Sequence, residues 1–518
     1  MKYKFKVSPL DISSGEKKIV VLHEEDAAEM NLSGSDRVQI SRNGVEEVAI
    51  VDLTEEFLEK GKIGTFSALT DKMDLKKDEE IYLEPIERPI SVKYIKEKLD
   101  GKELDEKKTR RIIEDIVKDR LSDIEMTAYM TSLYTCGMTE DESVDFTKSI
   151  IDTGEKLDVK SRKVVDKHCI GGVPGNRTTM LVVPIIAAAG LKIPKTSSRS
   201  ITSPAGTADA MEVLAPVDHS VEKLNEMIEK INGFIVWGGT INLASADDKL
   251  IRVRNPLSID PKGVLLGSIL GKKKAAGATH VLIDIPIGKG AKIEDRKEAE
   301  ELAESFMSLG TRLNMEIHCI ITPGYDPIGS AVGPALEARE ILKILNGEDV
   351  SEGLREKSLR MAGLMMEIGE AVKEGEGYYE AKKILETGKA KEKMKEIIKE
   401  QGGNPDIKPE DIELGEYTEE ITADKKGRIH YLHTKDIAEI GKVAGAPKDK
   451  GAGLYLEVEK GDNIEKGDKL MTIYAESKRK LESAIEEYRE REPLEMEKVI
   501  LGEYTTEKKP KVKRFKVD

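Results

Sequence analysis

Residues 167–179 (KHCIGGVPGNRTT) combine a lysine, a histidine, a cysteine, three glycines, an arginine and two threonines. The stretch is not a P-loop, because Asn176 and Arg177 stand where that motif has glycine and lysine. A zinc site is disfavoured, because no partner ligand follows at helical spacing. A glycine-rich turn between a strand at 164–165 and a helix near Thr178 would offer backbone N–H groups to an anion. An ordinary β–α turn with a surface lysine accounts for the same spacing equally well.

A second polar stretch, residues 197–209 (SSRSITSPAGTAD), carries six hydroxyl side chains and an arginine. It also follows a predicted strand, and loops after parallel strands converge at one edge of an α/β sheet. Hydroxyl and N–H groups bind phosphate without adding charge, so the two stretches together favour an anion site. The alternative is a solvated Ser/Thr loop.

A third region, residues 252–292, offers an acid and several lysines. Asp260 precedes Pro261, which is the pattern of a helix N-cap followed by a proline at the first helical position. Ser268 and Lys272 lie four residues apart and share a helix face. Lys289 and Lys292 follow a predicted strand. From spacing alone, a capping role for Asp260 and solvent-exposed lysines are the simpler interpretation.

Composition narrows the class of protein. The 518-residue chain has a net charge of −15 and 35% charged residues, which disfavours a nucleic-acid-binding protein. Three scattered cysteines exclude a disulfide scaffold. A composition rich in Lys and Glu is typical of hyperthermophiles. The sequence shows no signal peptide and no apolar run of 18 residues, so we expect a cytoplasmic protein that does not act at membranes.

The chain predicts an α/β multidomain protein. We expect a small β-rich N-terminal domain at 1–87, with a hairpin turn at Asn43-Gly44, and a helical lobe at 88–160 that is rejoined by about 245–275. An α/β lobe with a mixed sheet follows at 161–340, then a helical continuation at 341–417. A C-terminal α+β domain at 418–518 contains a β unit similar to the hammerhead of lipoyl and biotinyl carriers. A carrier function is disfavoured, because no Met-Lys pair lies at a hairpin tip.

Three segments resemble the thymidine phosphorylase and pyrimidine nucleoside phosphorylase family: residues 166–209, 326–345 and 453–475. The resemblance covers about residues 89–505. The N-terminal extension and the SSRSITSPAGT loop are similar to the archaeal AMP phosphorylase branch of that family. The resemblance implies a helical lobe and an α/β lobe separated by a cleft that closes on substrate, and no metal or cofactor.

The reaction that the resemblance implies is reversible phosphorolysis of AMP, with CMP and UMP as further candidate substrates, to the free base and ribose 1,5-bisphosphate. Phosphate is a co-substrate, and a homodimer or higher homo-oligomer is expected. Two enzymatic alternatives remain open: a thymidine or pyrimidine nucleoside phosphorylase, and more remotely a phosphoribosyltransferase.

The resemblance also assigns site residues. Asp260 matches the proton donor. The positions that match nucleotide contacts are Gly172, Ser198, Arg199, Ser200, Ile201, Thr202, Ser203, Thr207, Ser268 and Lys292. Phosphate-site positions are Lys167, Thr179 and Ser197, and base-site positions are His168, Arg254 and Lys272. Cys169 stands where bacterial relatives have a phosphate-binding serine, and a thiol is a weaker donor.

Overall fold

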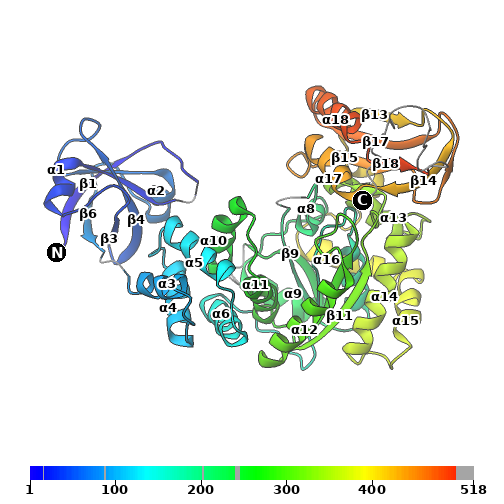
Figure 1. Cartoon of the computed structure of the whole chain (residues 1–518), viewed down its shortest axis with the longest axis horizontal. Coiled ribbons are helices and arrows are strands. Elements are labelled where there is room, and N and C mark those ends of the chain that lie inside the picture. Colours follow the sequence, from blue (N-terminus) through cyan, green and yellow to red (C-terminus); the bar gives the residue numbers. More distant parts are fainter. Residues whose placement is uncertain (16, 87–88, 201–202, 240–244, 498–518) are drawn as a thin grey trace, which may run out of the picture. The chain divides into compact units, whose positions relative to one another are not determined.

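The computed structural model describes residues 1–15, 17–86, 89–200, 203–239 and 245–497 (Figure 1). The chain divides into two compact units. Unit 1 is Met1–Gly154 with Ala244–Ser268, and unit 2 is Glu155–Leu243 with Ile269–Asp518. In the described part of the chain, no helix is both long enough and apolar enough to cross a bilayer.

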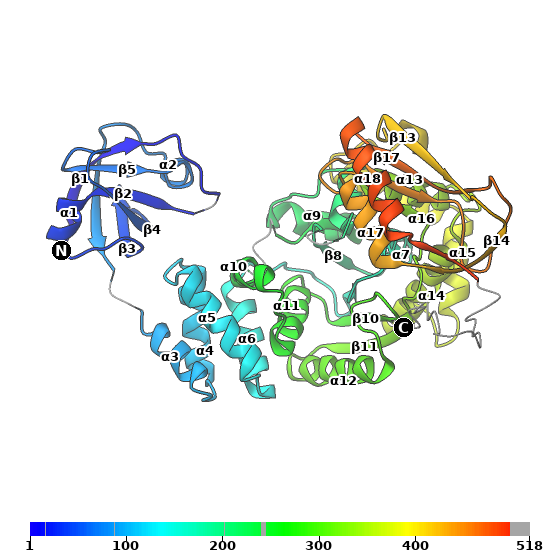
Figure 2. The same ribbon diagram turned by 45° about the horizontal axis from the view of Figure 1, so that its top comes forward.

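The N-terminal part of unit 1 is a closed six-stranded barrel in the order β1-β5-β2-β4-β3-β6 (Figure 2). Its strands are β1 (Tyr3–Pro9), β2 (Ile19–His23), β3 (Arg37–Arg42), β4 (Val45–Thr54), β5 (Lys62–Thr65) and β6 (Glu80–Pro85), with helices α1 (Glu24–Glu29) and α2 (Ser67–Met73). Alternating apolar residues fill the interior, among them Val20, Ile40 and Ile63. The barrel therefore has its own core.

The β3–β4 hairpin forms at the predicted turn. Arg42 pairs with Val45, so the loop is the two residues Asn43 and Gly44, both at positive φ (49° and 83°). Two-residue hairpin loops of this kind match the strand twist and favour Asn-Gly.

The remainder of unit 1 is helical. Its elements are α3 (Ser91–Leu99), α4 (Glu106–Val117), α5 (Asp123–Thr135), α6 (Glu140–Thr153), α10 (Ser245–Arg254), the short η1 (Asn255–Leu257) and the first half of α11 (Lys262–Ala275). Capping boxes start α5 (Ser122 with Glu125) and α6 (Thr139 with Glu142). Helix α11 runs across the boundary between the units, which lies after Ser268.

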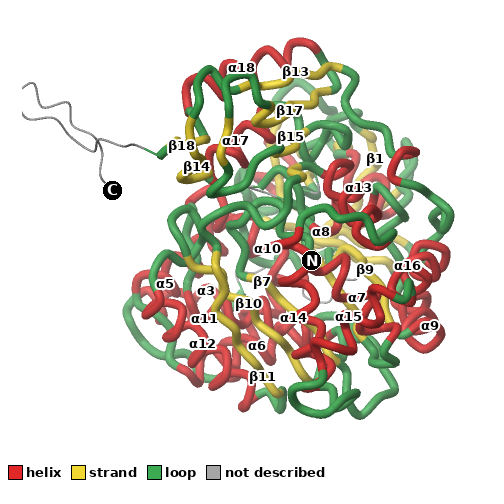
Figure 3. The backbone as a smooth tube through the Cα atoms, turned by 90° about the vertical axis from the view of Figure 1, so that its right-hand side faces the viewer, coloured by secondary structure: helices red, strands yellow, loops and turns green. Residues whose placement is uncertain are grey.

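The first part of unit 2 is an α/β layer. Its strands are β7 (Val165–Cys169), β8 (Ile193–Ser197), β9 (Gly233–Trp237), β10 (His280–Ile287) and β11 (Glu316–Pro323), and its helices are α7 (Thr178–Ala188), α8 (Thr207–Glu212), α9 (Val221–Ile231) and α12 (Arg296–Arg312). Strand β10 lies between β11 and β7 (Figure 3). Strand β8 pairs with β9, and a bridge from Val164 to Lys192 links the two sets.

The prediction of a mixed sheet here is wrong in one respect. All pairings among the described residues of β7 to β11 are parallel. The reason lies in the connections, since a helix or longer crossover follows each strand and returns the chain to the same end. The carboxyl ends of β7, β8 and β10 therefore share one edge.

Helices and a β-rich region complete unit 2. Helices α13 (Pro334–Leu345), α14 (Glu352–Ile368), α15 (Gly377–Glu386) and α16 (Lys389–Glu400) join α7 in one large apolar core. A turn, η2 (Pro409–Asp411), leads to antiparallel sheets of β12 (Ala331–Val332), β13 (Tyr417–Thr422), β14 (Gly427–Leu432), β15 (Gly453–Leu456), β16 (Asn463–Ile464), β17 (Lys469–Ala475) and β18 (Leu494–Met496), with α17 (Thr434–Val443) and α18 (Lys478–Arg491).

Candidate active site

The loop after β7 holds a buried lysine. Lys167 is 1% exposed, and its ammonium donates to the Thr178 hydroxyl at 2.5 Å. Burial lowers the pKa of Lys167 to about 8, and the neighbouring Asp284 and Asp166 oppose that shift. Thr179 is also buried, in the first turn of α7. The surface-lysine interpretation of this loop is therefore wrong.

Cys169, the residue that departs from the bacterial pattern, is a weak candidate for an anion contact. Its thiol accepts a hydrogen bond from the Asn176 side-chain amide at 3.2 Å. Burial, together with the Asp284 charge, raises its pKa to about 12, so the thiol stays neutral.

The loops after β7 and β10 are in close contact. Gly172 has a φ of +90°, and a Cβ at that position would lie 2.6 Å from the backbone nitrogen of Lys292. A side chain would therefore force the two loops apart. Gly172 and Lys292, both predicted as nucleotide contacts, can lie this close because glycine has no side chain to clash with the Lys292 backbone.

The loop after β8 is held by Asp209. Its carboxylate accepts the backbone N–H groups of Ser200 (2.7 Å) and Gly206 (2.9 Å). The Ser200 hydroxyl contacts Ser203. The Ser197 hydroxyl is buried and has no hydrogen-bond partner in the described chain. Its hydrogen-bonding capacity is therefore available to a ligand.

Arg199 does not offer a spare positive charge to this loop. Its guanidinium binds Glu212 at 2.7 and 2.5 Å, lies 3.4 Å from Asp218 and stacks on Trp237. The Glu212 hydrogen bond leads the effects that raise the pKa of Arg199. The guanidinium of this predicted nucleotide contact is therefore already paired with carboxylates.

His168 lies among lysines that sequence reasoning did not single out. Lys195 and Lys273 are 5% and 3% exposed, both donate to the Thr196 carbonyl, and Lys273 is 2.7 Å from Asp166. Burial, followed by these cations, lowers the pKa of His168 well below its ordinary value, so its imidazole is neutral. Lys272, the predicted base contact, is half-buried.

A second group of predicted residues lies in unit 1. Asp260 is exposed over 46% of its side chain and pairs with the buried Arg254. Ser268 is buried and donates to Asp247 at 2.5 Å. Asp247 was not predicted; it is a fully buried carboxylate in α10 whose charge partly offsets the lowering of the Arg254 pKa by burial.

The expected capping role of Asp260 needs correction. Helix α11 begins at Lys262, one residue after the position that an Asp260 cap requires. The Asp260 carboxyl is exposed and faces a guanidinium, which favours its ionised form.

Other predicted residues have simpler positions. Ser198 is exposed at the start of its loop, and Thr207 is the first residue of α8. Ile201 and Thr202 lie outside the described residues.

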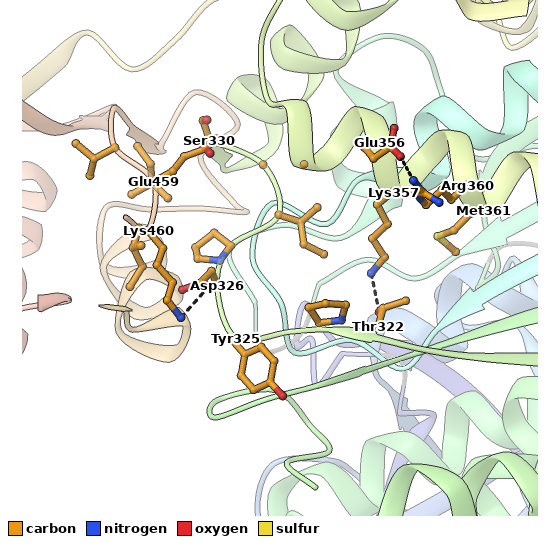
Figure 4. Close-up of a pocket in the computed structure, with 18 of the residues that line it drawn as sticks. Thr322, Tyr325, Asp326, Ser330, Glu356, Lys357, Arg360, Met361, Glu459 and Lys460 are labelled. Atoms are coloured by element: carbon orange, nitrogen blue, oxygen red, sulfur yellow. Dashed lines mark hydrogen bonds and ion pairs between the residues drawn. The ribbon is translucent and has the colours of Figure 1, made fainter. Parts of the chain in front are cut away.

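A cavity of about 690 Å³ lies elsewhere in unit 2, beside β11 and α14 (Figure 4). Its walls include Ile328, Lys357, Met361 and Leu456. None of the predicted site residues lines it.

Comparison with known proteins identifies the family. Residues 161–391 match the glycosyl transferase family a/b domain, 92–154 the helical bundle domain of that family, and 428–494 the pyrimidine nucleoside phosphorylase C-terminal domain. A solved anthranilate phosphoribosyltransferase from Thermus thermophilus shares the fold, with a TM-score of 0.50, 18% identity and coverage of 59% of this chain and 98% of that chain.

Curated relatives match over nearly the whole length. The AMP phosphorylase of Methanococcoides burtonii is 44% identical over 96% of this chain and 98% of its own. Those of Thermococcus sibiricus and Pyrococcus furiosus are also 44% identical, over 96% of this chain and 99% and 98% of theirs. The chain belongs to the AMP phosphorylase family.

Proposed function

We propose that the chain catalyses the reversible phosphorolysis of AMP. A phosphate oxygen attacks C1′ of the ribose, the bond from C1′ to the base nitrogen breaks, and adenine and ribose 1,5-bisphosphate are released. The names of the full-length relatives support this reaction. The observation that carries it here is the set of amine, hydroxyl and backbone N–H groups at or near the carboxyl ends of β7, β8 and β10, in a chain whose net charge is −15.

The proposed phosphate site uses Lys167, Thr179 and Ser197. Lys167 is a buried amine, and the Ser197 hydroxyl is buried without a partner. Charge-assisted hydrogen bonds from such groups hold an anion strongly, because little water competes. We assign the nucleotide to Gly172 and Lys292 and to residues 198–203, with Thr207 and Ser268 as further contacts.

The chemistry requires a proton for the leaving base. The transition state resembles an oxocarbenium ion, as in other glycosidic cleavages, and a base that leaves with its proton is a better leaving group. We assign the proton to Asp260. Because Arg254 favours its ionised form, this role requires substrate to separate the pair or to add negative charge beside the carboxyl.

The base site is assigned to His168, Arg254 and Lys272. A neutral imidazole can accept or donate one hydrogen bond at a ring nitrogen, which suits a neutral base better than an imidazolium would. Phosphate is the co-substrate, no cofactor takes part, and the working form is a homodimer or higher homo-oligomer.

The test is a panel of AMP, CMP, UMP, adenosine, uridine and thymidine, each with and without phosphate, in which released base is measured by chromatography. Phosphate-dependent release from monophosphates, well above release from nucleosides, supports the proposal. Equal or faster turnover of thymidine or uridine would instead identify a nucleoside phosphorylase. Activity that needs Mg²⁺ and is lost in EDTA would point to the phosphoribosyltransferase alternative.

A further inference from the structure

A second ion pair has its buried carboxylate on β10, the strand paired with that of the proposed phosphate lysine. Asp284, in the middle of β10, has no exposed surface. Its carboxylate accepts from the Thr322 hydroxyl at 2.6 Å and lies 2.9 Å from the Lys357 ammonium of α14. Lys357 also donates to Thr322 at 3.0 Å, so one carboxylate, one hydroxyl and one amine form a closed triangle.

The triangle is tied to the loop after β7 by the sheet itself. Asp284 is in register with Cys169, and its carbonyl accepts the N–H of Ile170. Lys167 lies two residues before Cys169 on β7, and the charge of the Asp284 carboxylate raises the pKa of Lys167. The charged or titratable groups that interact with Lys167 include Asp166, His168 and Cys169 on its own strand, Asp284 on β10, Lys357 on α14 and Lys195 on β8.

Lys357 and Lys167 therefore compete as the cation that balances the charge of Asp284. A buried carboxylate needs a cation nearby, and both Lys167 and Lys357 are close enough to act on Asp284. If Lys357 were absent, Lys167 would be the remaining close cation for Asp284. The Lys167 ammonium would then pair with the Asp284 carboxylate instead of binding phosphate.

We propose that Lys357 is a positioning residue of the phosphate site, which holds the charge of Asp284 so that the Lys167 ammonium stays available to phosphate. This inference rests on the proposed phosphate-binding role of Lys167. No motif that the sequence analysis selected contains Lys357, and the residue lies 190 positions after Lys167.

The surroundings of Lys357 make it a good residue to vary. Its side chain lines the 690 Å³ cavity and donates to Thr322, which also lines it (Figure 4). A smaller side chain at this position enlarges a cavity that already exists and leaves the surrounding packing in place. Lys357→Met keeps the aliphatic part, and Lys357→Arg keeps the charge.

The experiment measures phosphate KM, kcat and the pH dependence of kcat/KM for phosphate. With Lys357→Met we expect phosphate KM at pH 7 to rise about tenfold, the weight of one charge-assisted hydrogen bond, while kcat stays within about twofold. Lys357→Arg should restore most of the lost affinity.

The pH profiles separate this role from a structural one. In the wild type the alkaline limb reports loss of the Lys167 proton, whose pKa is about 8. The Lys357 charge lowers that pKa and the Asp284 charge raises it. Lys357→Met should therefore move the alkaline limb to higher pH, and Asp284→Asn should move it to lower pH.

Lys395→Met is the matched control, because it breaks an exposed lysine–carboxylate pair with Asp406 (3.1 Å) in the same unit. Thermal unfolding of each variant shows whether the fold is retained. The proposal is overturned if Lys357→Met matches this control in phosphate KM, or if its alkaline limb moves down. If Lys167→Met leaves phosphate KM unchanged, the assignment of Lys167 fails first; if the wild type releases no base, the proposed function fails instead.

Discussion

The core of the barrel contains no buried charged side chain among the described residues, whereas the α/β layer buries several. Among the described residues of 1–86, Thr65 is the one buried polar side chain, and the barrel core is otherwise apolar. The strands β7, β8 and β10, with α11, bury Lys167, Lys195, Lys273, Asp166 and Asp284. Burial of a charge is unfavourable unless it is paired. The difference shows that the α/β layer buries charged groups at a cost in stability, whereas the barrel core is almost entirely apolar.

The largest effect is expected at the proposed proton donor. Asp260→Asn removes the proton but keeps the size of the side chain, so turnover should fall by about 10²- to 10⁴-fold. The unfolding midpoint should fall only slightly, because the Asp260 side chain is 46% exposed and Asp247 remains to act on the buried Arg254. Single-turnover kinetics with AMP check the rate, and near-normal turnover would remove Asp260 from the mechanism.

A buried charge with a purely structural task gives the next effect. Lys98 is 3% exposed and binds both carboxylate oxygens of Glu142 at 2.7 and 2.8 Å. Lys98→Met leaves the Glu142 carboxylate buried without its cation in the helical core, so the free energy of unfolding should fall by about 3–5 kcal/mol. Denaturant unfolding measures it, and a change below 1 kcal/mol would mean that the pair is better solvated than its burial indicates.

The barrel core should behave as an ordinary apolar core. Ile63 on β5 has no exposed surface, and Ile63→Ala should lower the free energy of unfolding by about 2–5 kcal/mol through lost contacts and a cavity. Turnover per folded molecule should remain that of the wild type. A loss of turnover larger than the loss of folded protein would give the barrel a part in the reaction.

The opposite pattern is expected at the phosphate lysine. Lys167→Met should raise phosphate KM by about 10- to 100-fold, since one charge-assisted hydrogen bond is lost. The unfolding midpoint should stay unchanged or rise, because burial disfavours the charged amine and lowers its pKa to about 8. A variant that loses stability and affinity together would show that Lys167 supports the fold, and the contrast with the barrel would fail.

Local signals predicted local structure well. The predicted Asn43-Gly44 turn is formed by neighbours in sequence, and it is present. The strands of the α/β layer were also recognisable, but their pairing as a parallel sheet depends on the crossovers, which no short window contains.

The site could be predicted only in part. The glycine- and hydroxyl-rich loops stand out as compact stretches of sequence. Lys195, Lys273 and Lys357 could not be found in this way, because each lies in an unremarkable lysine-containing segment and acquires its role only when folding brings Asp166 or Asp284 beside it. Arg199 shows the converse, since a conspicuous charge is taken up by Glu212, thirteen residues away.

The most direct test follows AMP and phosphate by ³¹P NMR in the presence of the purified chain, with released adenine measured in parallel. The account predicts one new sugar species with two phosphate resonances, at C1 and C5 of ribose, in equal amount to adenine, and no reaction when phosphate is omitted. Adenine release that does not depend on phosphate, or a product with a single phosphate, would contradict phosphorolysis of AMP.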